Sequence, residues 1–372
     1  MRIGIDFRMA GTKHGGIGRY VLELVKNLVK IDNQNEYFLF HNQDGIDKLE
    51  CQFTTHYSLP TIYYIPVNVR HYSVAEQVFF PKILSKYNLD IVHFPNFNVP
   101  LLYKQPFIVT IHDIIHHKLG NVKKRNWLYF WAYKKIIKSA VQNSKKIITV
   151  SEGSKSDIIN EFNIPEEKVV VIYEGSTEAK TSLPKVINEF KKKYLLDKPF
   201  FLFVGVKQRN KNLPMLCKAF GRFVKESGLD FDLVIAGRTD PHYPDITQDC
   251  LSLSENLVFI EHFNDEDLEI LYHQATAFVS ASLFEGFGLP GLEAMSRGLP
   301  LAVSNIPVFN EIYESGAIYF DPNSPESIAE CLKLLAQDRL YYMQLREKAL
   351  KRSREFSWEK CAKETLKVYS DI

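Results

Sequence analysis

Short apolar runs alternate with amphipathic helical patterns along most of this 372-residue chain, and that alternation constrains its fold more than any other feature. In the first half, the pattern predicts strands at 3–7, 37–41, 61–66, 90–94, 107–112, 146–151 and 169–173. Strands that alternate with helices form a mainly parallel sheet with helices on both faces. The sequence therefore predicts an α/β fold.

A second series of the same kind begins near residue 200, with strands predicted at 200–205, 231–237, 257–261, 276–280, 301–304 and 317–320. The polar, Lys-rich stretch 174–198 reads as a linker, and the chain is too long for one ordinary core. We therefore predict two doubly wound, Rossmann-like domains, 1–180 and 198–355. Because ligands bind outside the carboxyl ends of such strands, we expect the site in a deep cleft that the two domains face.

Composition excludes several classes of protein. The formal net charge of +2 gives no reason to expect nucleic acid as a partner. The five cysteines are scattered without a Cys-x-x-Cys pair, which indicates reduced thiols rather than a disulfide framework or a zinc site. No apolar run approaches the ~18 residues of a spanning helix, and the first residues resemble a strand rather than a signal peptide. These features predict a cytoplasmic protein.

Two glutamates bracket the segment Glu-Gly-Phe-Gly-Leu-Pro-Gly-Leu-Glu, from Glu285 to Glu293. Gly286 and Gly288 predict a tight turn with room for a ligand against the backbone, and Pro290 suits the first position of a helix. Glu285 is then expected on a loop and Glu293 in the first helical turn, beside an anion-binding helix end. Such a pair could grip a polyhydroxylated, phosphorylated ligand.

A basic loop, Gly205-Val206-Lys207-Gln208-Arg209-Asn210-Lys211-Asn212, lies between a predicted strand and a helix. Arg209 as a bidentate donor and Lys211 as a point charge match a diphosphate, although a solvated loop is the alternative. Another loop, Gly15-Gly16-Ile17-Gly18, could let N–H groups approach a phosphate or could be a plain turn. Because the fingerprint Gly-x-Gly-x-x-Gly is absent, a nicotinamide enzyme is disfavoured.

His112 ends the predicted strand 107–112, where open sheets hold ligands. A structural hydrogen-bonding role is equally compatible with that position. His116 and His117 follow closely, but without a carboxylate cluster of recognisable spacing they are poor evidence for zinc.

The segment 123–146 holds eight Lys or Arg residues, several aromatic residues and no acidic one. Basic residues interleaved with Trp and Tyr are typical of a helix at an anionic membrane surface. A core helix with a solvated basic side is the alternative. The first interpretation predicts a protein that is peripheral at the inner face of the cell membrane.

Four segments together resemble one known family across nearly the whole chain: the retaining glycosyltransferases of the GT-B fold, family GT4. The segments are Gly16-Ile17-Gly18-Arg19-Tyr20, Thr110-Ile111-His112-Asp113, the loop 205–213, and 282–295 with its Glu-x7-Glu motif. The resemblance implies that the last helix crosses back to the first domain, which adds 356–372 to it.

The same resemblance implies roles for single residues. Lys211 would hold the donor diphosphate and offset the charge of the leaving group, while Glu285 and His112 would contact the donor sugar, His112 from the facing domain. These three are the implied catalytic residues. The implied donor-binding residues, which include the ribose partner Glu293, are Gly16, Gly205, Arg209, Phe287, Gly288, Leu289 and Glu293. No metal and no other cofactor is implied.

The chain departs from the family pattern in three places. Asn210 occupies the position of a common Arg, with Arg209 one place early. Glu261-His262 stands where relatives usually carry a Gly-aromatic pair near the base, which puts base recognition in doubt. Glu174 replaces a common Asn.

The Gly-Ile-Gly-Arg-Tyr start and the His-Asp pair most resemble the mannosyltransferase-like branch of bacterial surface polysaccharide synthesis. GDP-mannose is the leading donor and a growing, lipid-linked glycan the expected acceptor, while UDP-glucose, UDP-N-acetylglucosamine and dTDP-rhamnose stay open. A non-hydrolysing nucleotide-sugar 2-epimerase is disfavoured by the Glu-x7-Glu loop. An inactive nucleotide-sugar-binding protein is disfavoured by the retained Lys211, Glu285 and Glu293.

Overall fold

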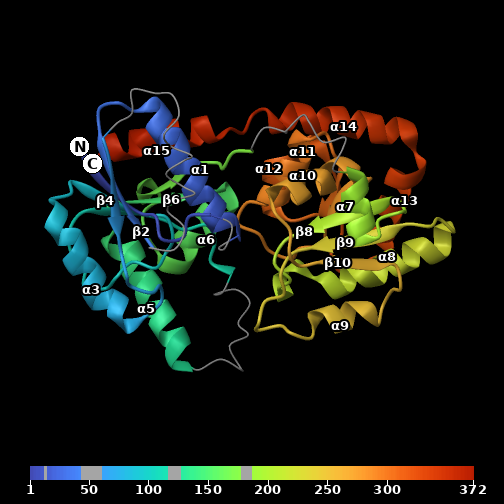
Figure 1. The fold of residues 1–372 in the computed structure, drawn as a ribbon, viewed down its shortest axis with the longest axis horizontal. Coiled ribbons are helices and arrows are strands. Elements are labelled where there is room, and N and C mark those ends of the chain that lie inside the picture. Colours follow the sequence, from blue (N-terminus) through green and yellow to red (C-terminus); the bar gives the residue numbers. More distant parts are fainter. Residues whose placement is uncertain (12–14, 43–60, 116–126, 177–186) are drawn as a thin grey trace. The chain divides into compact units, whose positions relative to one another are not determined.

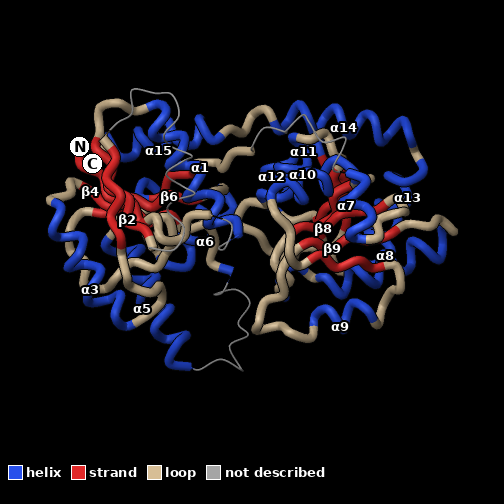
Figure 2. Tube along the Cα trace, in the orientation of Figure 1, coloured by secondary structure: helices blue, strands red, loops and turns tan. Residues whose placement is uncertain are grey.

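The computed structural model describes residues 1–11, 15–42, 61–115, 127–176 and 187–372. The chain divides into two compact units (Figure 1). The first unit comprises Met1–Glu174 together with Trp358–Ile372, and the second comprises Gly175–Ser357. In each unit the strands lie at the centre with helices around them (Figure 2), as the alternating pattern predicts.

The first unit is built on a seven-stranded parallel sheet in the order β3-β2-β1-β4-β5-β6-β7. Its strands are β1 (Arg2–Asp6), β2 (Glu36–His41), β3 (Ile62–Pro66), β4 (Ile91–Phe94), β5 (Phe107–Thr110), β6 (Lys146–Thr149) and β7 (Val169–Val171). Every residue of β4 and β5 is buried, because helices cover the sheet on both faces. These helices are α1 (Gly15–Ile31), α3 (Val74–Leu84), α5 (Trp127–Asn143), α6 (Glu152–Phe162) and α15 (Trp358–Ser370).

The last helix, α15, packs beside α1 (Figure 1), as the family resemblance predicts. A buried hydrogen-bond network holds it there: His93 Nδ1 lies 2.7 Å from the Tyr369 hydroxyl, and His93 Nε2 lies 2.7 Å from Thr110 Oγ1. Tyr20 extends the network to α1, with its hydroxyl 3.1 Å from Thr110 Oγ1. Burial, helped by the nearby charge of His112, lowers the pKa of His93 to about 3, so His93 is neutral near pH 7.

The second unit is built on a six-stranded parallel sheet in the order β10-β9-β8-β11-β12-β13. Its strands are β8 (Phe200–Val204), β9 (Asp232–Ala236), β10 (Leu257–Ile260), β11 (Ala277–Ser280), β12 (Leu301–Ser304) and β13 (Ala317–Phe320). Successive strands run outward from β8 to β10 and then outward from β11 to β13. The strand order therefore reverses between β8 and β11, and in open α/β sheets such a switch point is where ligands bind.

Eight helices of the second unit surround this sheet among the described residues. They are α7 (Ile187–Tyr194), α8 (Leu213–Ser227), α9 (Ile246–Leu251), α10 (Asp265–Gln274), α11 (Leu289–Ser296), α12 (Pro307–Tyr313), α13 (Pro325–Gln337) and α14 (Arg339–Ser353). Within the described parts of the chain, no helix is both long and apolar enough to span a membrane.

The structure corrects the interpretation of 174–198 as a plain linker, because this stretch contains α7. The buried ring of Phe190 anchors the helix, and the Tyr194 hydroxyl donates to the His262 carbonyl oxygen at 3.0 Å. Lys191, Lys192 and Lys193 lie in its last turn, where cations offset the helix dipole. The helix was not predicted because it is short and its apolar residues Ile187, Phe190 and Tyr194 stand among polar ones, including three successive lysines.

Candidate active site

The basic loop after β8 lies directly at the switch point. Arg209–Lys211 forms one turn of 3-10 helix, and Asn212 adopts a left-handed conformation with φ of 53° before α8 begins. The ammonium nitrogen of Lys211 lies 2.7 Å and 2.9 Å from the two carboxylate oxygens of Glu285, which follows β11. This ion pair therefore connects the loops that follow the two strands flanking the switch point.

Direct contact between Lys211 and Glu285 was not anticipated, since the family resemblance assigned Lys211 to the donor diphosphate and Glu285 to the donor sugar. The side chain of Lys211 is 19% exposed and that of Glu285 is 13% exposed, so little water screens the pair. The carboxylate holds the long lysine side chain in one conformation, which reduces the entropy lost when the ammonium binds a phosphate. The pair can thus present a preorganised positive charge at the switch point.

Asn210, which replaces the common family Arg, has a structural role. Its carbonyl oxygen accepts from the Leu283 N–H at 2.8 Å, and its side-chain amide donates to the Phe284 carbonyl oxygen at 3.2 Å. These bonds fix the loop that carries Glu285. Arg209, one place earlier, is exposed and so remains available for an anion, as the sequence prediction requires.

Glu293 lies in the second turn of α11, not in the first as predicted, because the helix begins at Leu289. Gly288 caps that helix and Pro290 falls within its first two positions. Glu293 is buried, and its Oε2 accepts from the Tyr272 hydroxyl at 2.9 Å. Tyr272 belongs to α10, so this bond ties the Glu-x7-Glu motif to the helix that follows β10.

Gly288 has a packing role that the sequence did not reveal. Its φ of 95° favours glycine, and an added Cβ would lie 2.2 Å from the Tyr313 hydroxyl oxygen. That hydroxyl donates to the Gly288 carbonyl oxygen at 2.6 Å. The space expected for a ligand on this side of Gly288 is therefore filled by Tyr313. The side chains of Phe287 and Leu289 are also buried, which leaves their backbone for a ligand contact.

Gly205 comes directly after β8 and packs against a second glycine. Its N–H donates to the Ala236 carbonyl oxygen at 2.9 Å. A Cβ on Gly237 would lie only 1.9 Å from the Gly205 carbonyl oxygen. The two glycines therefore let the ends of β8 and β9 approach closely.

The remaining predicted site residues, His112 and Gly16, belong to the first unit. The ring of His112 lies with Nδ1 3.2 Å from Glu174 Oε1 and Nε2 3.2 Å from the Pro95 carbonyl oxygen. Each ring nitrogen therefore has a hydrogen-bonding partner within the first unit. Glu174, the departure from the common Asn, is one of these two partners. Gly16 is exposed in the first turn of α1, and an added Cβ would have no neighbour within 4 Å.

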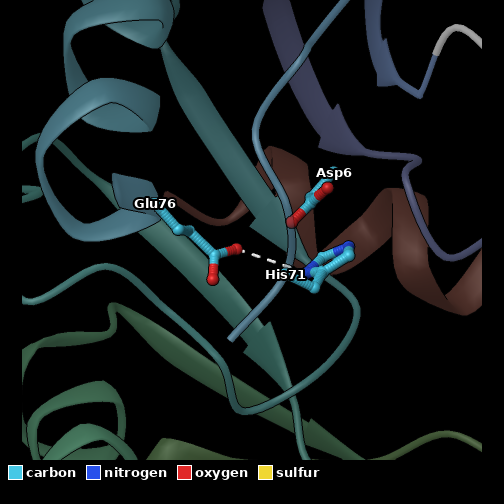
Figure 3. A group of neighbouring side chains, drawn as sticks. All are labelled: Asp6, His71 and Glu76. Atoms are coloured by element: carbon cyan, nitrogen blue, oxygen red, sulfur yellow. Dashed lines mark ion pairs between the residues drawn. The ribbon is translucent and has the colours of Figure 1, made fainter. Parts of the chain in front are cut away.

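Asp6, His71 and Glu76 form the one cluster of three or more metal-type ligands among the described residues (Figure 3). Arg8 already neutralises the two carboxylates: it donates to both oxygens of Asp6 at 2.7 Å and to Glu76 Oε1 at 2.7 Å. Its guanidinium also lies 3.7 Å from the Phe80 ring centroid. We interpret the cluster as a buried ion network that fastens the end of β1 to α3.

Burial raises the pKa of Asp6, but the charge and hydrogen bonds of Arg8 pull it below the usual value. For Glu76, burial likewise opposes ionisation, while hydrogen bonding from His71 and the charge of Arg8 lower the pKa overall. Both groups are therefore carboxylates near pH 7. His116 and His117, the other histidines considered for a metal, lie outside the described residues.

Sequence reasoning missed one charged pair at this edge of the sheet. Lys207 is fully buried, and its ammonium nitrogen lies 2.6 Å from Glu261 Oε1. The loop sequence suggests solvated lysines, so nothing local marks Lys207 as different from Lys211. The pair could have been suspected from Glu261, because this residue departs from the family pattern.

Comparisons with known proteins agree with this architecture. The sequence model described as Glycosyltransferase Family 4 matches residues 14–177, and the one described as Glycosyl transferases group 1 matches residues 185–354. O-antigen chain mannosyltransferase B of Escherichia coli is 28% identical over 371 residues, covering 95% of each chain. O-antigen chain mannosyltransferase RfbU of Salmonella typhimurium is 30% identical over 262 residues, covering 69% of this chain and 68% of the relative.

Among solved structures, Anabaena Alr3699/HepE in complex with UDP-glucose superposes with a TM-score of 0.77 at 16% identity, covering 100% of this chain and 99% of that one. At that identity the likeness shows the fold alone. Two parallel α/β sheets, read together with the relatives above, define a hexosyltransferase of the GT-B class. The chain belongs to glycosyltransferase family 4, as its motifs predict, and its matched relatives include O-antigen mannosyltransferases.

Proposed function

We propose that this enzyme transfers a mannosyl residue, with retention of anomeric configuration, from GDP-mannose to a growing, lipid-linked glycan. The observation that carries the proposal is the Lys211–Glu285 pair at the switch point of the second sheet. The choice of mannose is supported by the O-antigen mannosyltransferases that resemble the chain over most of its length.

In this proposal Lys211 donates to the donor diphosphate from the position in which Glu285 holds it. The ammonium then stabilises the negative charge that develops as the diphosphate leaves, which is the largest electrostatic demand of the reaction. Glu285 also accepts hydrogen bonds from sugar hydroxyls through its remaining lone pairs, and Glu293 accepts from the ribose. Because Lys211 supplies the positive charge, we propose that transfer needs no metal ion.

The reaction is tested by incubating the purified enzyme with each of four donors and a mannose-terminated polyprenyl diphosphate oligosaccharide, with EDTA present, and by recording masses. We expect the acceptor to gain one hexose from GDP-mannose. Faster transfer from UDP-glucose, UDP-N-acetylglucosamine or dTDP-rhamnose would replace the proposed donor. A nucleotide sugar converted to its epimer without acceptor would indicate the epimerase, and no change of any donor would indicate a binding protein.

We also propose that the first unit contacts an anionic membrane through α5. The inner face of this helix is buried through Tyr133 and Ile137, while Trp131 is 59% exposed. Lys134, Lys135 and Lys138 are exposed along the same helix. An exposed Trp among lysines suits the interface of an anionic bilayer. Residues 123–126 of the predicted basic segment lie outside the described residues.

The triple variant Lys134→Gln/Lys135→Gln/Lys138→Gln is expected to bind liposomes containing anionic lipid about a hundredfold more weakly than wild type, since each surface cation contributes about 1 kcal/mol. Co-sedimentation at low and high salt measures the change. The matched control Lys333→Gln/Lys348→Gln/Lys351→Gln removes three exposed cations of the second unit and should bind like wild type. Equal binding of all three proteins, or equal binding to neutral liposomes, would contradict the membrane proposal.

A further inference from the structure

A buried lysine holds a partly exposed carboxylate at the edge of the second sheet. Lys207 is fully buried, and its ammonium nitrogen lies 2.6 Å from Oε1 of Glu261 and 5.0 Å from the ring centroid of Phe259. Thr239 donates its hydroxyl to the same oxygen at 2.7 Å. The side chain of Glu261 is 43% exposed. Two protein donors therefore fix this carboxylate while part of it stays accessible to solvent or a ligand.

The anchoring is one-sided. Both donors contact Oε1, and within the described part of the chain no donor contacts Oε2. The hydrogen bonds from Lys207 and Thr239 lower the pKa of Glu261, so the group is a carboxylate near pH 7. Burying a lysine is costly unless its charge is paired, and a lysine–carboxylate pair adds little stability over an apolar pair. The arrangement is therefore better explained by a ligand that needs an oriented carboxylate than by stability.

The position of Glu261 matches the nucleoside end of the proposed donor. Glu261 directly follows β10, on the side of the sheet that runs β8, β9, β10 from the switch point. If the donor diphosphate binds at Lys211, the nucleoside can extend along the edge of the sheet either toward β10 or toward β13. Glu293, the proposed ribose partner, is hydrogen-bonded to Tyr272 of α10, the helix that follows Glu261. That bond favours the β10 direction and brings the base toward Glu261.

We propose that Glu261 selects guanine, with Lys207 as the positioning residue that aims its carboxylate. This inference rests on the proposed function, since it assigns the base of the same donor. Guanine presents two adjacent donors, N1–H and the N2 amino group, which suit a carboxylate. Uracil presents one N–H flanked by two carbonyl oxygens, which the carboxylate repels, and the corresponding edge of adenine carries an unprotonated ring nitrogen.

The test measures Kd for GDP, inosine diphosphate and UDP by isothermal titration calorimetry with wild type and Glu261→Gln. Lys207 must face an acceptor, so the glutamine oxygen should turn toward it and the NH2 group toward the base donors. We expect Glu261→Gln to weaken GDP binding at least tenfold and to leave UDP within threefold. Inosine diphosphate lacks the 2-amino group. It should therefore bind the wild type more weakly than GDP does, but it should bind Glu261→Gln with the same Kd as GDP. Glu266→Gln, an exposed charge-matched change nearby, should leave all three unchanged.

A second variant tests the positioning role. Lys207→Met retains the Glu261 charge but removes the ammonium group that holds the carboxylate in place. It should weaken GDP binding more than UDP binding, and so reduce the preference for GDP. If both variants bind GDP like wild type, or lose GDP and UDP equally, Glu261 does not select the base, while the GDP-mannose proposal stands. If wild type prefers UDP, both the inference and the donor fail. If no nucleoside diphosphate binds, the proposed function fails with them.

Discussion

Replacing Lys211 by methionine is expected to lower kcat for glycosyl transfer by about 10²–10³-fold, the usual effect of removing one preorganised group that stabilises developing charge. The ammonium is held within 2.9 Å of both Glu285 oxygens, so its position is set before the donor binds. Methionine has a similar length and no charge, and therefore removes the electrostatic contribution with little change in packing. Initial rates at saturating donor measure kcat, and donor titration measures KM separately.

The control for this prediction is Lys218→Met, which removes an exposed lysine from α8, the helix that follows the same loop. It should transfer sugar at the wild-type rate. A folded Lys211→Met enzyme with unchanged kcat would contradict the role of Lys211. A rise in KM alone would assign Lys211 to donor binding and not to the stabilisation of the leaving group.

Replacing Arg8 by methionine is expected to lower the free energy of unfolding of the first unit by about 3–5 kcal/mol, because it leaves two carboxylates buried without a counter-charge. Arg8 donates to Asp6 and Glu76, and its side chain is 0% exposed, as is that of Glu76. Chemical denaturation, followed by a signal from the first unit, measures the loss. The matched control is Arg2→Met in β1, because the side chain of Arg2 is 41% exposed and its ion pair with Glu36 should contribute less than about 1 kcal/mol.

The stability lost in Arg8→Met should depend on pH. In the wild type, Asp6 and Glu76 have lowered pKa values, so their contribution is present above the usual carboxyl range and is lost as pH falls through the folded-state values. Without Arg8, one of the causes that oppose burial is lost, so the pKa of both carboxyl groups rises relative to the wild type. The difference between variant and wild type should therefore shrink as pH falls from about 7 to about 4. A difference that is constant over this range would show that the loss arises from packing and not from charge.

Much of the fold could be predicted from the sequence because parallel α/β sheets repeat one local pattern. Fully buried strands such as β5 and β9 contain continuous apolar runs, 107–109 and 233–236, and α1 and α8 have clear apolar faces. The short helices α9 and α12 could not be predicted in this way, since six or seven residues do not establish a helical period. The start of α11 was misplaced by one residue, which moved Glu293 from the first turn to the second.

The candidate site was predictable in its composition but not in its contacts. The Glu-x7-Glu motif and the basic loop identified Lys211, Glu285 and Glu293 as site residues. However, Lys211 and Glu285 lie 74 positions apart, and local spacing carries no information on such a distance. For the same reason the sequence did not show that Tyr313 fills the space beside Gly288, or that Lys207 is buried.

The bond between His93 and Tyr369 joins residues 276 positions apart, and it has a consequence for how the chain folds on the ribosome. The ribosome makes α15 only after every residue of the second unit. β4 and α1 must therefore wait for the helix that covers them until the whole chain has been made. The first unit is the first to emerge and the last to finish, and its uncovered apolar surface is what a nascent-chain chaperone would recognise.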